Sequence, residues 1–465
     1  MKRVLKNGVA AACLCALAGL AHGQTAQVIA IGSVPGGFDF SQAWGVSRDG
    51  STVIGITNGD LNGIVDYYGF RASIDGTVEL IPSIVSRDIR GVSGDAGVLA
   101  GIAFKERPND PGEYDLTGWY WTADGGVVDL WSPILNWGST ANAVSRDGSA
   151  VVGMTDFFIN FGAGFEFSDA YVWRESTGVV KLPHLFDMFR AEAFGVSANG
   201  SVIVGYEQNM EEERFPVVWE AANGNAIRQL FVTEEELGSS LALVVSDNGA
   251  YAAGFSLMAM DIFGYREDLV MWDVATGAPT VLGQTPPGFY SAIPAAISDD
   301  GQMIVGTYNR FFFFDNPEGE IFVWRQGEGV RLLKNILTDD YGVDLTGWQL
   351  LAAHGMSEDG KTIVGHGLDP HGNMTGIIIR LDVSVCVADL SGSSDPNDPA
   401  YGVPDGQVDA SDFFYFLDQF VAGNDRVADL SGSSDPNDPA YGVPDGQIDA
   451  SDFFYYLDRF VAGCP

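Results

Sequence analysis

The chain has 465 residues, 46% of them hydrophobic, which is enough for two or three domains with a sizeable core. Its formal net charge of −38 excludes nucleic acid as a partner, because such a surface repels a phosphate backbone. This acidity suits salty surroundings and divalent cations, but it does not name a ligand.

The N-terminus has the pattern of a secretory signal peptide. Lys2, Arg3 and Lys6 form a basic start, the apolar run Val9–Leu20 follows, and small residues flank His22. The apolar run is too short to span a bilayer, and no later run is long enough. We therefore predict a signal peptide over residues 1–23 and a secreted, extracellular or cell-surface protein without a transmembrane segment.

One short pattern recurs seven times between residues 40 and 366. It begins with Ser, has Asp or Asn two positions later, and has Gly eight positions later in every copy. Gly stands at the third position in six copies, and Ala96 is the exception. An Asp-Gly or Asn-Gly step supplies the positive-φ positions of a hairpin turn, and the Ser and Asp oxygens can bond nearby amides. We interpret the pattern as turn chemistry rather than as seven catalytic dyads. The serines are Ser47, Ser93, Ser145, Ser197, Ser246, Ser298 and Ser357.

A second signal follows each hairpin. Five repeats continue into an aromatic strand that ends in Trp, as in AYVW at 170–173 or IFVW at 321–324, and then into a Gly-containing turn and another strand. Four short strands per repeat with a period near fifty residues predict an all-β fold, a seven-bladed β-propeller over residues 24–385. Two positions before the repeated Ser the residue is small in six copies, which suits a crowded innermost strand.

The ends of the array predict how the ring closes. The seventh repeat stops after its third strand near Leu381, whereas the strand at Gln27–Ile31 has no repeat of its own. We expect this N-terminal strand to complete the last blade, because closure removes exposed sheet edges. Through the S-x-D-G…V-V-G hairpin and the aromatic strand, residues 27–381 resemble the extracellular HAF repeats. That resemblance implies a fold rather than an activity.

The predicted propeller has one elaborated face, which would carry binding residues. The connections between first and second strands and between third and fourth strands are tight, whereas the other two sets are long and open on the same end. Aromatic and acidic residues on these long loops would suit a carbohydrate ligand. His366, Asp369 and His371 could form a metal corner with His354. No diagnostic nucleophile or metalloprotease motif occurs, so no catalytic residue is assigned.

The C-terminal residues 386–465 contain a near-perfect duplication. Residues 387–423 and 427–463 differ at three positions, and the tail holds fifteen Asp against two Arg. Each copy has the oxygen-bearing pattern of an EF-type calcium loop, split by twelve inserted residues, and then a short helix with apolar residues on one face. We predict two Ca²⁺ sites. The candidate ligands are Asp389, Ser391, Asp405, Gln407, Asp409 and Asp412 in the first loop, and Asp429, Ser431, Asp445, Gln447, Asp449 and Asp452 in the second.

Asp rather than Glu at the last loop position, with a closing Gly463-Cys464 pair, makes the tail similar to a dockerin domain. The resemblance implies calcium-dependent folding and attachment to a cohesin-like or surface scaffold partner, with Ala410-Ser411 and Ala450-Ser451 at the partner-contacting positions. Cys386 and Cys464 bracket the tail and suggest a disulfide, with two free thiols as the alternative.

Two functions fit these predictions. The favoured one is a non-enzymatic binding protein, in which the propeller presents a ligand-binding face and the dockerin-like tail attaches it to a scaffold or cell surface. The alternative is a glycan-cleaving enzyme, a hydrolase or lyase, carried by the same tail.

Overall fold

The structure is a computed structural model of the chain. It describes residues 25–32, 40–61, 64–85, 87–107, 110–130, 138–160, 165–185, 190–232, 236–260, 264–310, 319–383, 388–396, 398, 400–402, 407–436, 438, 440–442 and 445–463. The predicted signal peptide, Asp405, Cys386 and Cys464 lie outside these residues. Contacts divide the chain into two compact units, one built mainly from Val28–Ile336 and Leu345–Arg380, and the other containing Leu381–Pro465.

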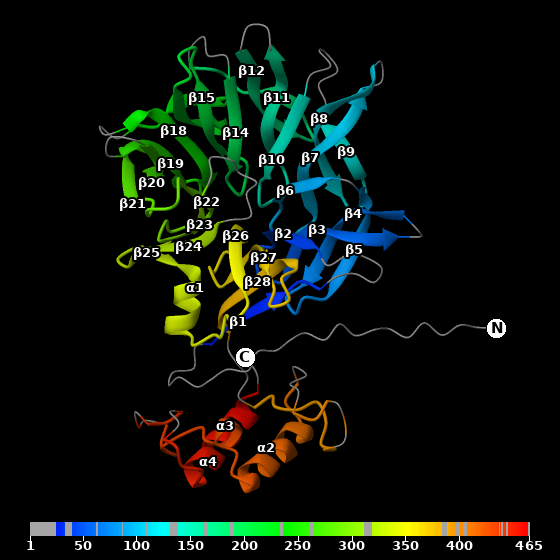
Figure 1. Ribbon diagram of the computed structural model, residues 1–465, viewed down its shortest axis with the longest axis vertical. Helices are drawn as coiled ribbons and strands as arrows, with labels where there is room; N and C mark the ends of the chain where they lie inside the picture. Colours follow the sequence, from blue (N-terminus) through cyan, green and yellow to red (C-terminus); the bar gives the residue numbers. More distant parts are fainter. Residues whose placement is uncertain are drawn as a thin grey trace, which may run out of the picture. The chain divides into compact units, whose positions relative to one another are not determined.

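The described part of the first unit contains seven groups of four strands, here called blades one to seven (Figure 1). Blades one, two and seven are separate four-stranded sheets, and single parallel bridges join blades three to six into one 16-stranded sheet. Blade one is β2 (Ser41–Val46), β3 (Thr52–Leu61), β4 (Ile64–Ser73) and β5 (Val78–Val85). Blade two is β6 (Asp88–Val92), β7 (Val98–Arg107), β8 (Asp110–Thr122) and β9 (Gly126–Leu130). Blade three is β10 (Gly138–Val144), β11 (Val151–Asn160), β12 (Phe165–Arg174) and β13 (Gly178–Lys181). Blade four is β14 (Arg190–Val196), β15 (Val202–Gln208), β16 (Arg214–Glu220) and β17 (Ala226–Gln229), with the 3-10 turn η1 (Ala221–Asn223) before its last strand.

The remaining blades repeat this order. Blade five is β18 (Glu236–Val245), β19 (Tyr251–Met260), β20 (Gly264–Asp273) and β21 (Pro279–Gly283). Blade six is β22 (Ser291–Ile297), β23 (Met303–Asn309), β24 (Glu320–Arg325) and β25 (Gly329–Leu332). Helix α1 (Leu333–Asn335) and a π-helical turn, η2 (Ile336–Asp340), lead to blade seven, which is β26 (Gln349–Met356), β27 (Thr362–Leu368), β28 (Met374–Val383) and β1 (Thr25–Ala30).

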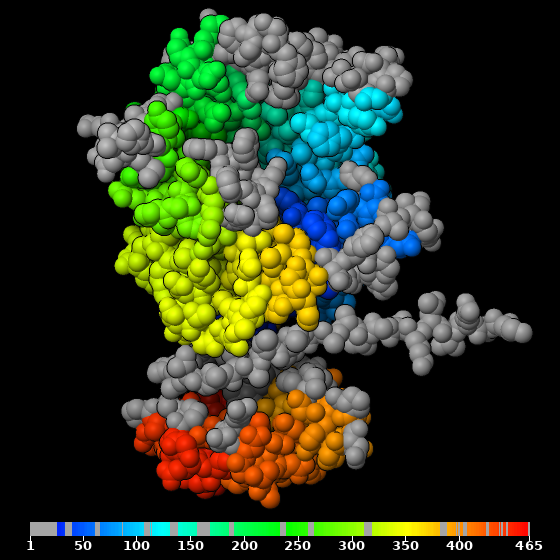
Figure 2. Space-filling view, viewed as in Figure 1, coloured from blue at the N-terminus to red at the C-terminus, as the bar shows by residue number. Residues whose placement is uncertain are grey.

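The blades form a closed ring, the arrangement of a β-propeller. The first strand of each blade contacts the first strand of the next, from β2 through β6, β10, β14, β18 and β22 to β26, and β26 contacts β2 again. Strand β1 pairs with β28, and the amide of Ile31 donates to the carbonyl of Gly376 over 2.8 Å. The predicted closure by the N-terminal strand is therefore confirmed. The first and last blades meet in the space-filling view (Figure 2).

The repeated hairpin is held by the predicted turn chemistry. In blade one the Ser47 hydroxyl donates to Asp49 over 2.6 Å, the Asp49 carboxylate accepts the Ser51 amide, and the Ser47 oxygen accepts the Thr52 amide. All seven repeats show this set of bonds, with Asn in place of Asp in two of them. The third position has positive φ throughout, and Ala96 adopts φ 53° without being Gly. The serines are therefore structural.

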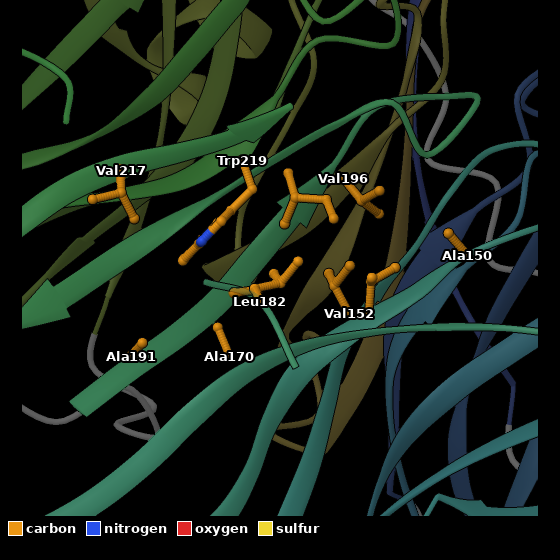
Figure 3. Close-up of a cluster of buried hydrophobic side chains, with 11 residues drawn as sticks. Ala150, Val152, Ala170, Leu182, Ala191, Val196, Val217 and Trp219 are labelled. Carbon is orange, nitrogen blue, oxygen red and sulfur yellow. The ribbon is translucent and has the colours of Figure 1, made fainter. Parts of the chain in front are cut away.

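In blades four and five the repeated Trp binds the blade to the one before it. Trp219 is fully buried and its indole nitrogen donates to the carbonyl of Pro183 in the preceding blade, and Trp272 donates likewise to Phe231. Trp219 also lies in a hydrophobic cluster with Leu182 and Val152, which fills the space between blades three and four (Figure 3). Replacing a buried Trp of this kind by Ala lowers the free energy of unfolding by about 3–5 kcal/mol. The aromatic strand thus supplies the packing between blades.

The second unit contains α2 (Ala410–Ala422), α3 (Asp425–Ala428) and α4 (Ala450–Ala462). Helices α2 and α4 face each other through Phe416 and Tyr456, whose rings stack at 3.8 Å with an interplanar angle of 7°. Both side chains are fully buried, and Ala388 and Ala428 complete the centre of this small core. The predicted apolar faces of the two duplicated helices therefore pack against each other.

Candidate functional site

The two duplicated loops of the second unit begin at Asp389 and Asp429 and end where α2 and α4 begin. Asp409 caps α2 by accepting the Ser411 amide over 2.8 Å, and Asp412 bonds back to the Asp409 amide in a capping box. Asp449 and Asp452 make the same contacts at α4. Ser, Asp and Asn favour this position because their oxygens satisfy amides that the first helical turn leaves unpaired. Each predicted loop therefore ends on a well-formed helix start.

Asp412 and Asp452 tie the start of each loop to its end. Asp452 is fully buried, and one of its oxygens accepts the amides of Leu430 over 2.6 Å and Ser431 over 2.8 Å. Its other oxygen accepts the Asp449 amide over 2.7 Å. Asp412 makes the equivalent bonds in the first loop. The carboxylate predicted at the last ligand position thus stands at the centre of each loop, already surrounded by backbone donors.

Asp429 joins the loop start to the turn beyond the insertion. Its two carboxylate oxygens accept the amides of Asp445 over 3.1 Å and Gly446 over 2.8 Å. Asp445 in turn accepts the Gln447 amide over 2.9 Å. Asp429 is therefore adjacent in space to Asp445 and Gly446, although the insertion separates them in sequence. The matching residues of the first loop, Asp405 and Gly406, lie outside the described residues.

Ser391 and Ser431 hold the insertion in place. The Ser431 hydroxyl is buried, donates to the carbonyl of Ser433 over 2.7 Å and accepts the amide of Gly442 over 2.8 Å. The Ser391 hydroxyl does the same with Ser393 and Gly402. Both hydroxyls therefore make their hydrogen bonds with the inserted residues. In the structure these two predicted ligands help to close the loops.

The oxygen groups of the loops fit calcium in kind. Carboxylate, amide and carbonyl oxygens are the ligands that Ca²⁺ takes, and a carboxylate that accepts two or three amides keeps further lone pairs. Gln407, Asp409, Gln447 and Asp449 are exposed, so they are open to solvent ions. Among the residues that the structure describes, no three His, Cys, Asp or Glu side chains already lie at metal-binding separation. The structure brings the loop ends together but does not gather a complete ligand set.

In the propeller, His184 lies in a cluster that no sequence motif marks. Its Nε2 atom is 2.9 Å from Asp169 and its Nδ1 atom is 2.8 Å from the fully buried carboxylate of Glu207. Lys181 also bonds Asp169 over 2.6 Å. Hydrogen bonds to Asp169 and Glu207 raise the pKa of His184 to about 9. The cluster joins blades three and four through a charged imidazolium, and it was not predictable because its members come from separate strands.

The histidines predicted as a metal site in blade seven do not come together in the structure. His354 and His366 are neighbours, with 2.9 Å between ring nitrogens, and Trp44 of blade one stacks on His354 at 4.1 Å. Burial lowers the pKa of His366 to about 4, so the pair is neutral. The His371 side chain is 78% exposed and lies beside Asp369 at 3.7 Å. This arrangement is an aromatic contact between blades seven and one rather than a set of metal ligands.

Comparison with known proteins gives distant likenesses only. No protein-family model matches the chain, and no curated protein matches it significantly. Among solved structures, the chain is similar to a putative TolB from Agrobacterium tumefaciens, with 13% identity over 71% of this chain and 98% of that one and a TM-score of 0.38. It is also similar to the β-propeller domain of the Trilobed protease from Pyrococcus furiosus, with 10% identity over 82% and 99% and a TM-score of 0.45.

An oligogalacturonate lyase from Vibrio parahaemolyticus is a third likeness, with 11% identity, coverage of 78% of this chain and 98% of that one, and a TM-score of 0.49. At these levels of identity none of the three transfers an activity, so the propeller assignment rests on the strand order and ring contacts described above. Within the described part of the chain, no helix has the length and apolar character needed to cross a bilayer.

Proposed function

We propose that this is a secreted, non-enzymatic binding protein, in which the propeller presents a ligand-binding face and the C-terminal unit binds calcium and attaches the protein to a scaffold or cell surface. The observation that carries the proposal is the network of the second loop. Asp429 reaches the amides of Asp445 and Gly446, and Asp452 reaches those of Leu430 and Ser431. The acidic side chain at each end of the split loop therefore accepts hydrogen bonds from backbone amides of the other part of the loop.

A bound calcium ion would neutralise the negative charge of the loop. The second unit carries a strong excess of Asp, and like charges held close together repel unless a cation or hydrogen bonds offset them. Asp389, Asp409 and Asp412 in the first loop, and Asp429, Asp445, Asp449 and Asp452 in the second, would hold the ion. The bound ion would supply charge neutralisation, and the loops would then keep α2 and α4 in a fixed relation for a partner.

Calorimetric titration of chelator-treated full-length protein with calcium chloride tests the metal assignment. We expect two binding events for the unchanged protein and one for Asp429→Asn, because Asn keeps the size of the side chain and removes its charge. Asp458→Asn is the matched control, since Asp458 lies on the exposed side of α4 and bonds the Tyr441 hydroxyl over 2.7 Å. Absence of calcium heat in the unchanged protein would overturn the assignment.

Attachment is tested separately, with a pull-down from the envelope of the producing cell. We expect the full-length protein to retain one envelope component in calcium and to release it in chelator. The double variant Asp412→Asn/Asp452→Asn should fail to retain it, whereas Asp418→Asn/Asp458→Asn should retain it. Equal recovery in chelator and in calcium would sink calcium-dependent docking while leaving the metal assignment to the titration.

A further inference from the structure

The two copies of the duplication in the second unit differ at three positions, and two of these positions carry contacts between the copies. The first pair differs by one methylene group, and both of its members pack at the edge of the small helical core. The other two pairs differ in hydrogen-bonding groups, because one gains a hydroxyl and the other exchanges an amide for a guanidinium. In chain order the three pairs are Val408/Ile448, Phe416/Tyr456 and Gln419/Arg459. The two loops are therefore not held in the same way.

In the second copy, the hydroxyl of Tyr456 reaches from α4 to the start of the first loop. It donates to the carbonyl oxygen of Ala388 over 3.4 Å, across 68 positions of the chain. The ring stacks on Phe416 at 3.8 Å, which fixes the direction in which the hydroxyl points. Ala388 is buried and immediately precedes Asp389, the first predicted ligand of that loop. Helix α4 therefore holds the start of the loop that belongs to the other copy.

In the first copy, Phe416 has no hydroxyl, and Gln419 connects α2 to the start of the second loop instead. The Gln419 side-chain oxygen accepts the side-chain amide of Asn424 over 2.8 Å. The carbonyl of Asn424 accepts the backbone amide of Ala428 over 2.9 Å, which builds the short helix α3. Ala428 is buried and immediately precedes Asp429, the first predicted ligand of the second loop. Helix α2 therefore holds the start of the loop in the other copy.

Arg459, at the position equivalent to Gln419, makes cation–π contacts within its own copy. Its guanidinium carbon lies 4.8 Å from the centre of the Tyr455 ring and 5.9 Å from that of the Tyr441 ring. Tyr441 belongs to the inserted residues of the second loop, and its hydroxyl bonds Asp458 of α4 over 2.7 Å. An exchange of Gln for Arg at this position therefore replaces a contact between the copies by contacts within one.

We propose that Tyr456 and Gln419 position the two calcium loops, each by holding the start of the loop in the other copy. Holding the residue before the first ligand fixes that carboxylate relative to the end of the loop. Less conformational freedom is then lost when an ion binds, and the affinity rises. Each calcium site therefore depends on a side chain from the other copy. The inference rests on the proposed calcium binding of the second unit and does not involve the propeller.

Calorimetric titration of chelator-treated full-length protein with calcium chloride tests this in two single-loop proteins. Asp429→Asn removes the charge of the first ligand in the second loop and leaves the first loop to bind, and Asp389→Asn does the opposite. In the Asp429→Asn protein, we expect Tyr456→Phe to weaken calcium binding about two- to fivefold and Gln419→Arg to leave it unchanged. In the Asp389→Asn protein, the effects of these two variants should be exchanged.

A second readout needs no calcium. The amides of Leu390 and Leu430 donate to the carboxylates that close the first and second loops. In chelator, hydrogen exchange at Leu390 should be faster in Tyr456→Phe, and exchange at Leu430 should be faster in Gln419→Arg. Neither variant should change exchange at the other amide, which separates local positioning from a general loss of the helical core.

Tyr455→Phe is the matched control, because it removes a hydroxyl of α4 that lies beside Gly442 of the second loop. It should leave calcium binding by the first loop and exchange at Leu390 unchanged. Three results would overturn the proposal: equal weakening in both single-loop proteins, weakening of the loop in the same copy, and unchanged affinity and exchange in both variants. Absence of calcium heat in the unchanged protein would overturn the proposed calcium binding and this inference together, whereas calcium heat with unselective variants would overturn this inference alone.

Discussion

His184 should make the stability of the propeller depend on pH in the alkaline range. In the folded protein its pKa is about 9, whereas in the unfolded chain it returns to about 6.5. Between these values the folded state holds a proton that the unfolded state releases, so raising the pH favours unfolding. The stabilisation is fully present below pH 6.5 and is lost as the pH rises through 9.

The size of the effect follows from the same two values. One pKa unit corresponds to about 1.4 kcal/mol, which would give roughly 3 kcal/mol for a fully shielded group. The His184 side chain is 24% exposed, so solvent screening reduces the expected contribution to about 2 kcal/mol. Deprotonation weakens the hydrogen bonds of the imidazolium to Asp169 and to the buried Glu207, and this is the physical origin of the loss.

Urea unfolding measured from pH 6 to pH 10 checks this prediction. The unchanged protein should lose about 2 kcal/mol of unfolding free energy from this residue across the range, and His184→Gln should show a correspondingly flatter slope. His371→Gln is the control, because His371 is largely exposed and should leave the slope unchanged. Parallel slopes for the unchanged protein and His184→Gln would refute the reasoning.

Three further predictions concern the repeats and the helical unit. Gly153→Ala should lower the free energy of unfolding, measured in urea, by roughly 3 kcal/mol, because the added Cβ atom would clash with the Thr140 carbonyl oxygen. A loss below about 1 kcal/mol would contradict this clash. Hydrogen bonds from Ser47 and the Ser51 amide lower the pKa of Asp49 to about 2, so stability present above pH 3.8 is lost as the pH falls toward 2. Ser47→Ala should move acid unfolding to higher pH, and an unmoved midpoint would disprove this. Tyr456→Ala should destabilise the helical unit by about 3–5 kcal/mol and lower its calorimetric transition alone, whereas a shift of the propeller transition would contradict separate folding units.

Features determined by neighbouring residues were predictable from the sequence. The Ser, Asp and Gly of each hairpin interact within six residues, so their pattern specifies the turn directly, as at Ser47 and Asp49. The N-terminal strand could be assigned to the last blade because the repeat count left one strand without a blade and one blade without a strand. The helices at Ala410–Ala422 and Ala450–Ala462 follow from the helical spacing of their apolar residues.

Features that depend on register or on distant segments were not predictable. The bulge at Asn142 reflects how β10 pairs with β11, and the sequence of β10 alone does not show which residue is skipped. The His184 cluster draws Asp169 and Glu207 from two different blades. Ser391 carries the oxygen expected of a ligand, but the path of the inserted residues commits it to Ser393 and Gly402.

The pairing of β1 with β28 has a consequence for how the molecule assembles. The Thr375 hydroxyl bonds the Ile31 carbonyl across 344 positions of the chain, and Gly376 bonds both Ile31 and Ser41. Blade seven therefore cannot form from any local stretch of sequence, and β1 stays unpaired until β28, the last described strand, exists. Such distant contacts slow folding, because a long loop must be closed before they form. Ring completion is thus a late, cooperative event, and it makes the six earlier blades dependent on a strand that lies beyond all of them.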